Sequence, residues 1–147
     1  MTQHPHYPKI LVFLQFGLVG LMLLFSTGIF SSLVGLVIFF VGLVVGIFAL
    51  FRNRLGNFNI QPKMKENAEL ITTGIYAYVR HPMYLSLILM MLGVWVGSPT
   101  FLETLFMLLL ILTLLLKAKK EESIWLQESE AYVAYKKRSK LLLPFIL

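Results

Sequence analysis

The stretch Thr72-Thr73-Gly74-Ile75-Tyr76-Ala77-Tyr78-Val79-Arg80-His81-Pro82-Met83-Tyr84 holds guanidinium, imidazole and phenol groups in a row and runs directly into an apolar segment. Pro82 suits the first turn of a helix, because its missing N–H would have no partner at that position anyway. His81 is then the N-cap residue, and Arg80 lies just outside the helix. The free N–H groups and the dipole of such a helix end attract anionic groups. The stretch therefore predicts either an interfacial anchor or a ligand site.

The composition indicates an integral membrane protein. Of the 147 residues, 58% are hydrophobic, and the mean hydropathy is +0.80. Soluble domains are about 45–50% apolar. The net charge of +6 indicates a cytoplasmic membrane face and not a nucleic-acid partner. The absence of cysteine excludes disulfides and thiolate sites, and no metal site is predicted from the two histidines near the N-terminus.

Long apolar runs predict an all-α integral membrane fold, because about 20 apolar residues suffice for a helix to cross a bilayer. The first run is too long for the apolar part of a signal peptide, so it is expected to be retained. Four transmembrane helices are expected, at about 10–30, 33–51, 82–97 and 100–117. They form one membrane domain, 1–147, with an N-terminal hairpin (10–51), a cytoplasmic interfacial loop (52–81) and a catalytic hairpin with an amphipathic C-terminal helix (82–147).

The basic residues set the expected topology. With four spans, every Lys and Arg lies on one side of the membrane, and the opposite turns 26–32 and 97–100 carry none. The positive-inside rule then places both termini and the long loop in the cytoplasm. Treating 83–116 as one helix gives three spans instead. That alternative splits the basic residues between the two faces, and Gly97-Ser98-Pro99 interrupts the helix.

Two features inside the spans allow a structural or a functional interpretation. Gly42 and Gly46 form a GxxxG pattern, which either joins two copies of the chain or packs against its own helices. Packing against the protein's own helices is favoured, because the pattern is common in membrane helices. A monomer or a homodimer is expected. Glu103 is an acid near membrane depth and hence a functional candidate. Its spacing from Thr100 favours a capping box at a helix start.

Two polar clusters meet at the cytoplasmic face if the third and fourth spans form an antiparallel hairpin. The first contains Tyr76, Tyr78, Arg80, His81 and Tyr84, and the second contains Lys117, Glu121, Glu122, Tyr132, Tyr135 and Arg138. Carboxylates and aromatic faces both favour a cation, so the clusters could hold a cationic or zwitterionic cofactor. Alternatively, these residues only anchor the protein at the interface, with the basic run 136–140 on anionic lipid headgroups.

These motifs resemble the signature of the isoprenylcysteine carboxyl methyltransferase and phospholipid methyltransferase superfamily. The resemblance rests on Leu70 to Tyr84, Glu121-Glu122, Tyr132-x-x-Tyr135-Lys136-Lys137-Arg138, Leu143-Pro144 and, more weakly, Asn57-Phe58-Asn59. It implies a membrane-embedded methyltransferase that uses S-adenosylmethionine and releases S-adenosylhomocysteine. The cofactor contacts that it implies are Leu70, Ile71, Tyr76, His81, Pro82, Met83, Tyr84 and Glu121, with Arg80 and Glu122 as adjoining candidates.

The acceptor is left open by the sequence. Lys117 stands where the family usually has a substrate-facing Arg, and Lys cannot form a planar bidentate grip on a carboxylate. A prenylcysteine carboxylate, a phospholipid amine, a small thiol and another apolar acid are the candidate acceptors, and a lipidic or apolar acceptor is expected to enter between the helices from the bilayer. No catalytic base is assigned, because displacement at a sulfonium depends mainly on positioning and electrostatics. The alternatives to an enzyme are a small four-helix transporter using Glu103 and a non-catalytic membrane adaptor.

Overall fold

The computed structural model describes residues 6–28, 30–53 and 69–144, and every regular element in them is helical. The elements are α1 (Tyr7–Phe25), α2 (Leu33–Asn53), the short 3-10 helix η2 (Gly74–Ala77), α3 (Pro82–Gly97), α4 (Phe101–Glu128) and α5 (Glu130–Arg138). The predicted all-α class is thereby confirmed. Half of the expected interfacial loop, residues 54–68, lies outside the described residues, including the element Asn57-Phe58-Asn59.

Three of the described helices, α1, α2 and α4, are long and apolar enough to cross a membrane. The fourth apolar helix, α3, has the predicted bounds but only 16 residues. At about 1.5 Å per residue it is roughly 24 Å long, which is less than the ~30 Å hydrocarbon core of a bilayer. The chain is therefore an integral membrane protein with three candidate spans, and the crossing of α3 stays a prediction.

The ends of two helices differ from the prediction. The first helix ends at Phe25 and not near residue 30, because Ser26 is extended (ψ 121°) and caps the last turn. The fourth predicted span, 100–117, continues without a break to Glu128. Residues 117–128 are mostly good helix formers, so the helix runs on beyond the apolar segment. Ser129 then ends α4 and begins α5 in an extended conformation that any residue can adopt (φ −146°).

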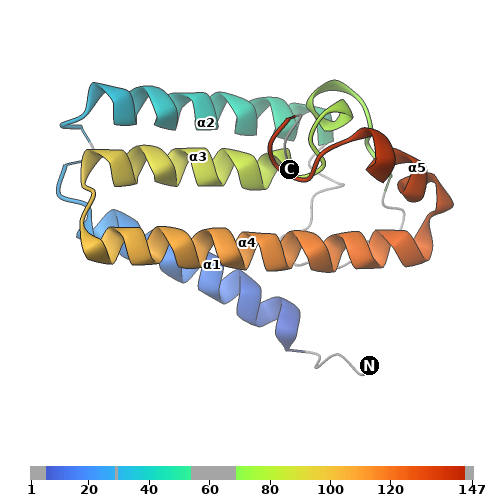
Figure 1. Ribbon diagram of the computed structural model, residues 1–147, viewed down its shortest axis with the longest axis horizontal. Helices are drawn as coiled ribbons and strands as arrows, with labels where there is room; N and C mark the ends of the chain where they lie inside the picture. The colour runs from blue at the N-terminus through green and yellow to red at the C-terminus, as the bar shows by residue number, and fades with distance from the viewer. Residues whose placement is uncertain (1–5, 29, 54–68, 145–147) are drawn as a thin grey trace.

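Helix α2 packs closely along α3, and the two run side by side in Figure 1. The contact depends on small residues. A Cβ atom at Gly42 would lie 2.7 Å from the backbone nitrogen of Met90, and one at Gly46 would lie 2.5 Å from Ser86 Oγ. The Ser86 hydroxyl donates a 2.6 Å hydrogen bond to the Gly42 carbonyl. The GxxxG pattern therefore serves packing within the chain, as favoured from the sequence.

Helix α1 packs mainly on α4, which it crosses obliquely in Figure 1. Met22 from α1 and Leu110 and Leu114 from α4 are fully buried in the shared core. Trp95 Nε1 donates a 2.8 Å hydrogen bond to Thr104 Oγ1 and so joins α3 to α4. The bundle thus brings the start of α3 and the C-terminal half of α4 to the same end of the molecule (Figure 1).

The start of α4 shows half of the predicted capping box. Thr100 Oγ1 accepts a 3.1 Å hydrogen bond from the Glu103 backbone N–H. The reciprocal bond is absent, because the Thr100 N–H donates to the Ser98 carbonyl instead. Both Glu103 carboxyl oxygens are buried without a hydrogen-bond partner in the described part of the chain. The capping-box prediction was therefore right for the Thr100 side chain and wrong for the Glu103 side chain.

Candidate active site

The segment that precedes α3 is hydrogen-bonded to Lys140 and Leu141, near the C-terminus. The Arg80 backbone N–H donates to the Lys140 carbonyl (2.8 Å), and the Lys140 N–H donates to the Tyr78 carbonyl (2.9 Å). The next contact runs from the His81 N–H to the Leu141 carbonyl (3.1 Å). Leu142 is buried in the core, so this part of the C-terminal segment packs against the bundle. These backbone bonds fix the position of His81, which is the N-cap of α3 as predicted.

A buried ion pair connects this segment to α4. Arg80 Nε lies 2.5 Å from Glu122 Oε1, and both side chains are 7% exposed. The Arg80 guanidinium also donates to the backbone carbonyls of Lys136 (3.3 Å) and Ser139. Lys136 Nζ lies 2.8 Å from Glu122 Oε2, so the Glu122 carboxylate faces two cations. Charge-assisted bonds of this kind are short and strong when buried. The pair therefore holds α4, α5 and the start of α3 together.

His81 lies between both members of the acid pair. Its Nδ1 is 3.4 Å from Glu121 Oε2, and its Nε2 is 3.6 Å from Glu122 Oε1. Burial opposes protonation, but the two carboxylates outweigh it and raise the pKa of His81 above its ordinary value. Nε2 is buried and has no hydrogen-bond partner among the described residues. The imidazole is therefore held between the two carboxylates, with Nε2 facing Glu122.

The Tyr84 side chain joins three parts of the cluster. Its hydroxyl donates a hydrogen bond to Glu121 Oε1, and its ring stacks on the His81 imidazole with centroids 5.4 Å apart. Lys117 Nζ lies 5.1 Å from the centroid of the same ring. Lys117 is only 1% exposed, and its ammonium donates a 2.5 Å hydrogen bond to Gln15 Oε1 of α1. A lysine and an amide from two spans thus form the inner wall of the site.

Aromatic residues of α5 support η2 from the other side. The Tyr135 hydroxyl donates a 2.6 Å hydrogen bond to the Tyr76 carbonyl. Burial raises the pKa of Tyr135 to about 12 and raises the pKa of Tyr76 further, so both phenols stay neutral at physiological pH. Tyr132 contacts Tyr135 edge-on and stacks on Trp125 of α4. These contacts hold the backbone at Tyr76 beside the acid pair.

The structure brings together most of the residues singled out from the sequence. Side-chain contacts or buried positions in one cluster are found for Tyr76, Arg80, His81, Pro82, Tyr84, Lys117, Glu121, Glu122, Tyr132 and Tyr135. Leu70 and Ile71 are half-buried in the irregular segment before η2, and Met83 packs against the hydrophobic core. Arg138 is exposed, and its guanidinium carbon lies 6.0 Å from the centroid of the Tyr135 ring.

Three further residues belong to the cluster but were not predicted as site residues: Gln15, Lys136 and Ser139. Gln15 carried a signal, because a single amide in an otherwise apolar span needs a buried partner. Lys136 and Ser139 carried none, since their contacts depend on the turn between α4 and α5. That turn folds α5 back from the end of α4 toward the start of α3, as Figure 1 shows.

Comparison with known families agrees with this arrangement. A family model described as phospholipid methyltransferase matches residues 30–132, which is more than half of the chain. The match begins before α2, further toward the N-terminus than the motifs alone indicated, and it ends at Tyr132. No curated protein matches the chain. The chain belongs to the phospholipid methyltransferase family and is a membrane methyltransferase.

Proposed function

We propose that the protein transfers a methyl group from S-adenosylmethionine to a lipophilic or small acceptor at the membrane. The observation that carries this proposal is the convergence of Glu121 and Glu122 on His81, where α4 meets the entry to α3. Carboxylates and aromatic faces grouped at a bundle end favour a cationic ligand, and the methyl donor is a sulfonium cation. Bound there, the cofactor would supply an electrophilic methyl group.

Glu121 is the better candidate for a cofactor contact. Its side chain is 21% exposed, whereas that of Glu122 is 7% exposed and already faces Arg80 and Lys136. Glu122 therefore positions the site, and Glu121 would face the positive charge of the cofactor. His81, which faces both carboxylates, is a further candidate for a polar contact to the cofactor. Leu70, Ile71, Tyr76, Pro82, Met83 and Tyr84 complete the proposed cofactor-binding set.

The acceptor side of the site would be reached from within the bilayer. Lys117, buried between Gln15 and the Tyr84 ring, is the proposed acceptor-facing residue. The family description favours a phospholipid amine as acceptor, with a prenylcysteine-like carboxylate and a thiol as alternatives. No side chain is assigned as a general base. We place both termini and the site on the cytoplasmic side, with α3 as the fourth span, because all basic residues then share one face.

A labelling experiment tests this proposal. The purified protein would be incorporated into liposomes made from a membrane lipid extract and supplied with S-adenosylmethionine that carries a labelled methyl group. We expect labelled lipid from the wild type and strongly reduced labelling from Glu121→Gln. Glu128→Gln is the matched control, because Glu128 is an exposed acid on the same helix. Equal labelling by wild type and Glu121→Gln would contradict the assignment.

A further inference from the structure

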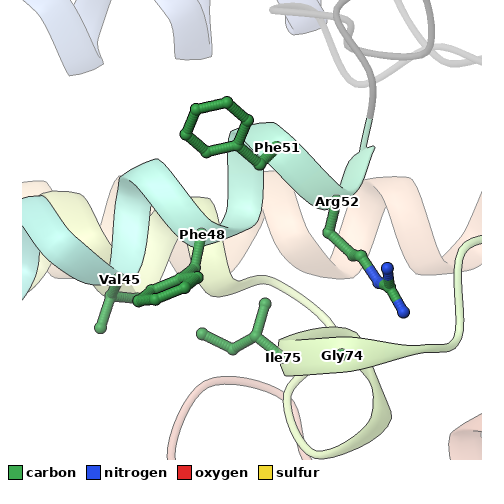
Figure 2. Close-up of a pocket in the computed structure, with 6 residues that line it drawn as sticks. All are labelled: Val45, Phe48, Phe51, Arg52, Gly74 and Ile75. Carbon is green, nitrogen blue, oxygen red and sulfur yellow. The ribbon is translucent and has the colours of Figure 1, made fainter.

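A cavity of about 440 Å³ lies between the C-terminal end of α2 and η2. It is lined by Val45, Phe48, Phe51, Arg52, Gly74 and Ile75. None of these residues belongs to the His81 cluster. Figure 2 shows Phe48 and Ile75 facing each other, with the Arg52 side chain reaching toward Gly74 at one end. The volume falls within the range of about 300–1,000 Å³ that small-molecule sites occupy.

Among the described residues, the lining of the cavity is apolar apart from one cation. Val45, Phe48, Phe51 and Ile75 supply hydrocarbon, and Arg52 supplies a guanidinium at the cavity. Arg52 forms no ion pair with any residue in the described ranges 6–28, 30–53 and 69–144. Guanidinium groups bind phosphate and carboxylate through two parallel hydrogen bonds. The cavity thus offers an apolar wall and one anion-binding group.

Gly74 lets Arg52 approach the backbone of η2. Its φ of +64° is a left-handed conformation that favours glycine, and a Cβ atom there would lie 2.9 Å from Arg52 Nε. Any larger residue would push the Arg52 side chain aside. The glycine therefore keeps the guanidinium against the cavity.

The cavity also lies at the edge of a membrane span. Helix α2 is one of the candidate spans, and Arg52 is the basic residue in its last turn. Phe48 and Phe51 are 64% and 83% exposed, as expected for side chains that face lipid. A bilayer lipid beside α2 would have its hydrocarbon level with Phe48 and its headgroup level with Arg52.

We propose that this cavity binds a bilayer lipid with an anionic headgroup, whose phosphate or carboxylate pairs with Arg52 and whose hydrocarbon contacts Val45, Phe48 and Ile75. The occupant is identified by charge complementarity to the single guanidinium and by the apolar lining. The lining residues are distinct from those of the His81 cluster, with Ile75 adjoining Tyr76 in η2, and the proposed lipid binding does not depend on methyl transfer. It is expected to bind its lipid in the presence or absence of a methyl donor.

Lipid binding to the detergent-purified full chain, followed by native mass spectrometry, tests the proposal. The probes are medium-chain phosphatidylglycerol, phosphatidylcholine of the same chain length, and inorganic phosphate. We expect phosphatidylglycerol to bind best, and Arg52→Gln to weaken its binding about tenfold, as expected for loss of a hydrogen bond between charged groups. Lys119→Gln, which removes an exposed charge from α4 outside the cavity, should leave the affinity unchanged.

A second variant tests the apolar part of the site. Val45→Trp would fill the cavity and should weaken binding of both lipids while Arg52 remains in place. Equal phosphatidylglycerol affinity in wild type and Arg52→Gln would overturn the proposal, as would an equal loss in Lys119→Gln. Binding of inorganic phosphate as tightly as of phosphatidylglycerol would show an anion site without a lipid and would also overturn it.

Discussion

Arg80 and Glu122 form a buried ion pair across the junction of three helices, with Arg80 Nε 2.5 Å from Glu122 Oε1 and both side chains 7% exposed. Arg80 precedes α3, Glu122 lies in α4, and the same guanidinium bonds backbone carbonyls at the end of α5. The pair is therefore the main polar link between the segments that build the candidate site.

Arg80→Ala should destabilise the protein strongly. The variant leaves the buried Glu122 carboxylate with two partners, Lys136 and His81. Removing one member of a buried ion pair typically costs about 3–5 kcal/mol of stability. Arg80→Lys should recover only part of this, because Lys cannot reproduce the bonds to the Lys136 and Ser139 carbonyls. Denaturant unfolding in detergent measures the effect. Arg138→Ala, at an exposed position of α5, is the control and should be nearly neutral.

The stabilising contribution of His81 should depend on pH. Its pKa is raised in the folded state, since Glu121 and Glu122 outweigh burial, and its unfolded pKa is about 6.5. The contribution is therefore fully present below about pH 6.5 and is lost as the pH rises through the folded-state pKa. The stability difference between wild type and His81→Asn should shrink from about pH 6 to pH 9. A difference that grows over this range in thermal unfolding would contradict the assignment.

Tyr135→Phe should weaken the contact between α5 and η2. It removes the donor to the Tyr76 carbonyl, and an unsatisfied buried acceptor costs about 1–3 kcal/mol. The loss should appear both as a lower unfolding temperature and as weaker cofactor binding, because Tyr76 belongs to the proposed site. Tyr78→Phe is the matched control, since Tyr78 is 61% exposed, and it should change neither quantity.

Gly42→Ala should destabilise the bundle whether or not the protein forms dimers. A Cβ atom there would lie 2.7 Å from the Met90 nitrogen and 2.8 Å from the Ser86 carbonyl oxygen, so α2 and α3 must separate. Overpacking of this kind costs about 1–3 kcal/mol. Gly20→Ala is the control, because nothing lies within 4 Å of its added Cβ. If Gly42→Ala changed only the oligomeric state and not the unfolding of the monomer, the packing role would be wrong.

Gln15→Leu should destabilise the protein through Lys117. The ammonium of Lys117, 1% exposed, would lose its hydrogen bond to Gln15, at a cost of about 1–3 kcal/mol or more for a charged group. The double variant Gln15→Leu/Lys117→Met removes both polar groups and should be more stable than Gln15→Leu alone. Chemical unfolding of the four members of this cycle measures the coupling. A Gln15→Leu variant as stable as wild type would exclude the contact.

The helices and the cluster differ in how far they could be predicted. Apolar runs and Pro82 gave the bounds of α3 correctly, because a proline in the first turn marks a helix start. The end of α4 was missed by the span prediction, because hydropathy detects where apolar residues stop and not where a helix stops. Gly42 and Gly46 were interpreted correctly, since small residues in a span indicate close helix packing.

The partners within the cluster were harder to predict. The sequence indicated that Glu121 and Glu122 would meet His81, because the helical connection between them is short and antiparallel. It could not separate their roles, since neighbouring residues on a helix differ in direction by about 100° and the facing element was unknown. The structure directs Glu122 to Arg80 and Lys136 and directs Glu121 to Tyr84. Gln15, the buried partner of Lys117, lies 102 residues away in sequence, so the contact could be found only from the tertiary fold.

The central claim is that the cluster around His81 and Glu121 binds the methyl donor. Calorimetric titration of the detergent-purified protein with S-adenosylhomocysteine tests it without needing to know the acceptor. We expect binding by wild type and by Glu128→Gln, and binding reduced at least about tenfold, or 1.4 kcal/mol, in both His81→Ala and Glu121→Gln. No binding by folded wild type, or wild-type affinity in both site variants, would contradict the claim.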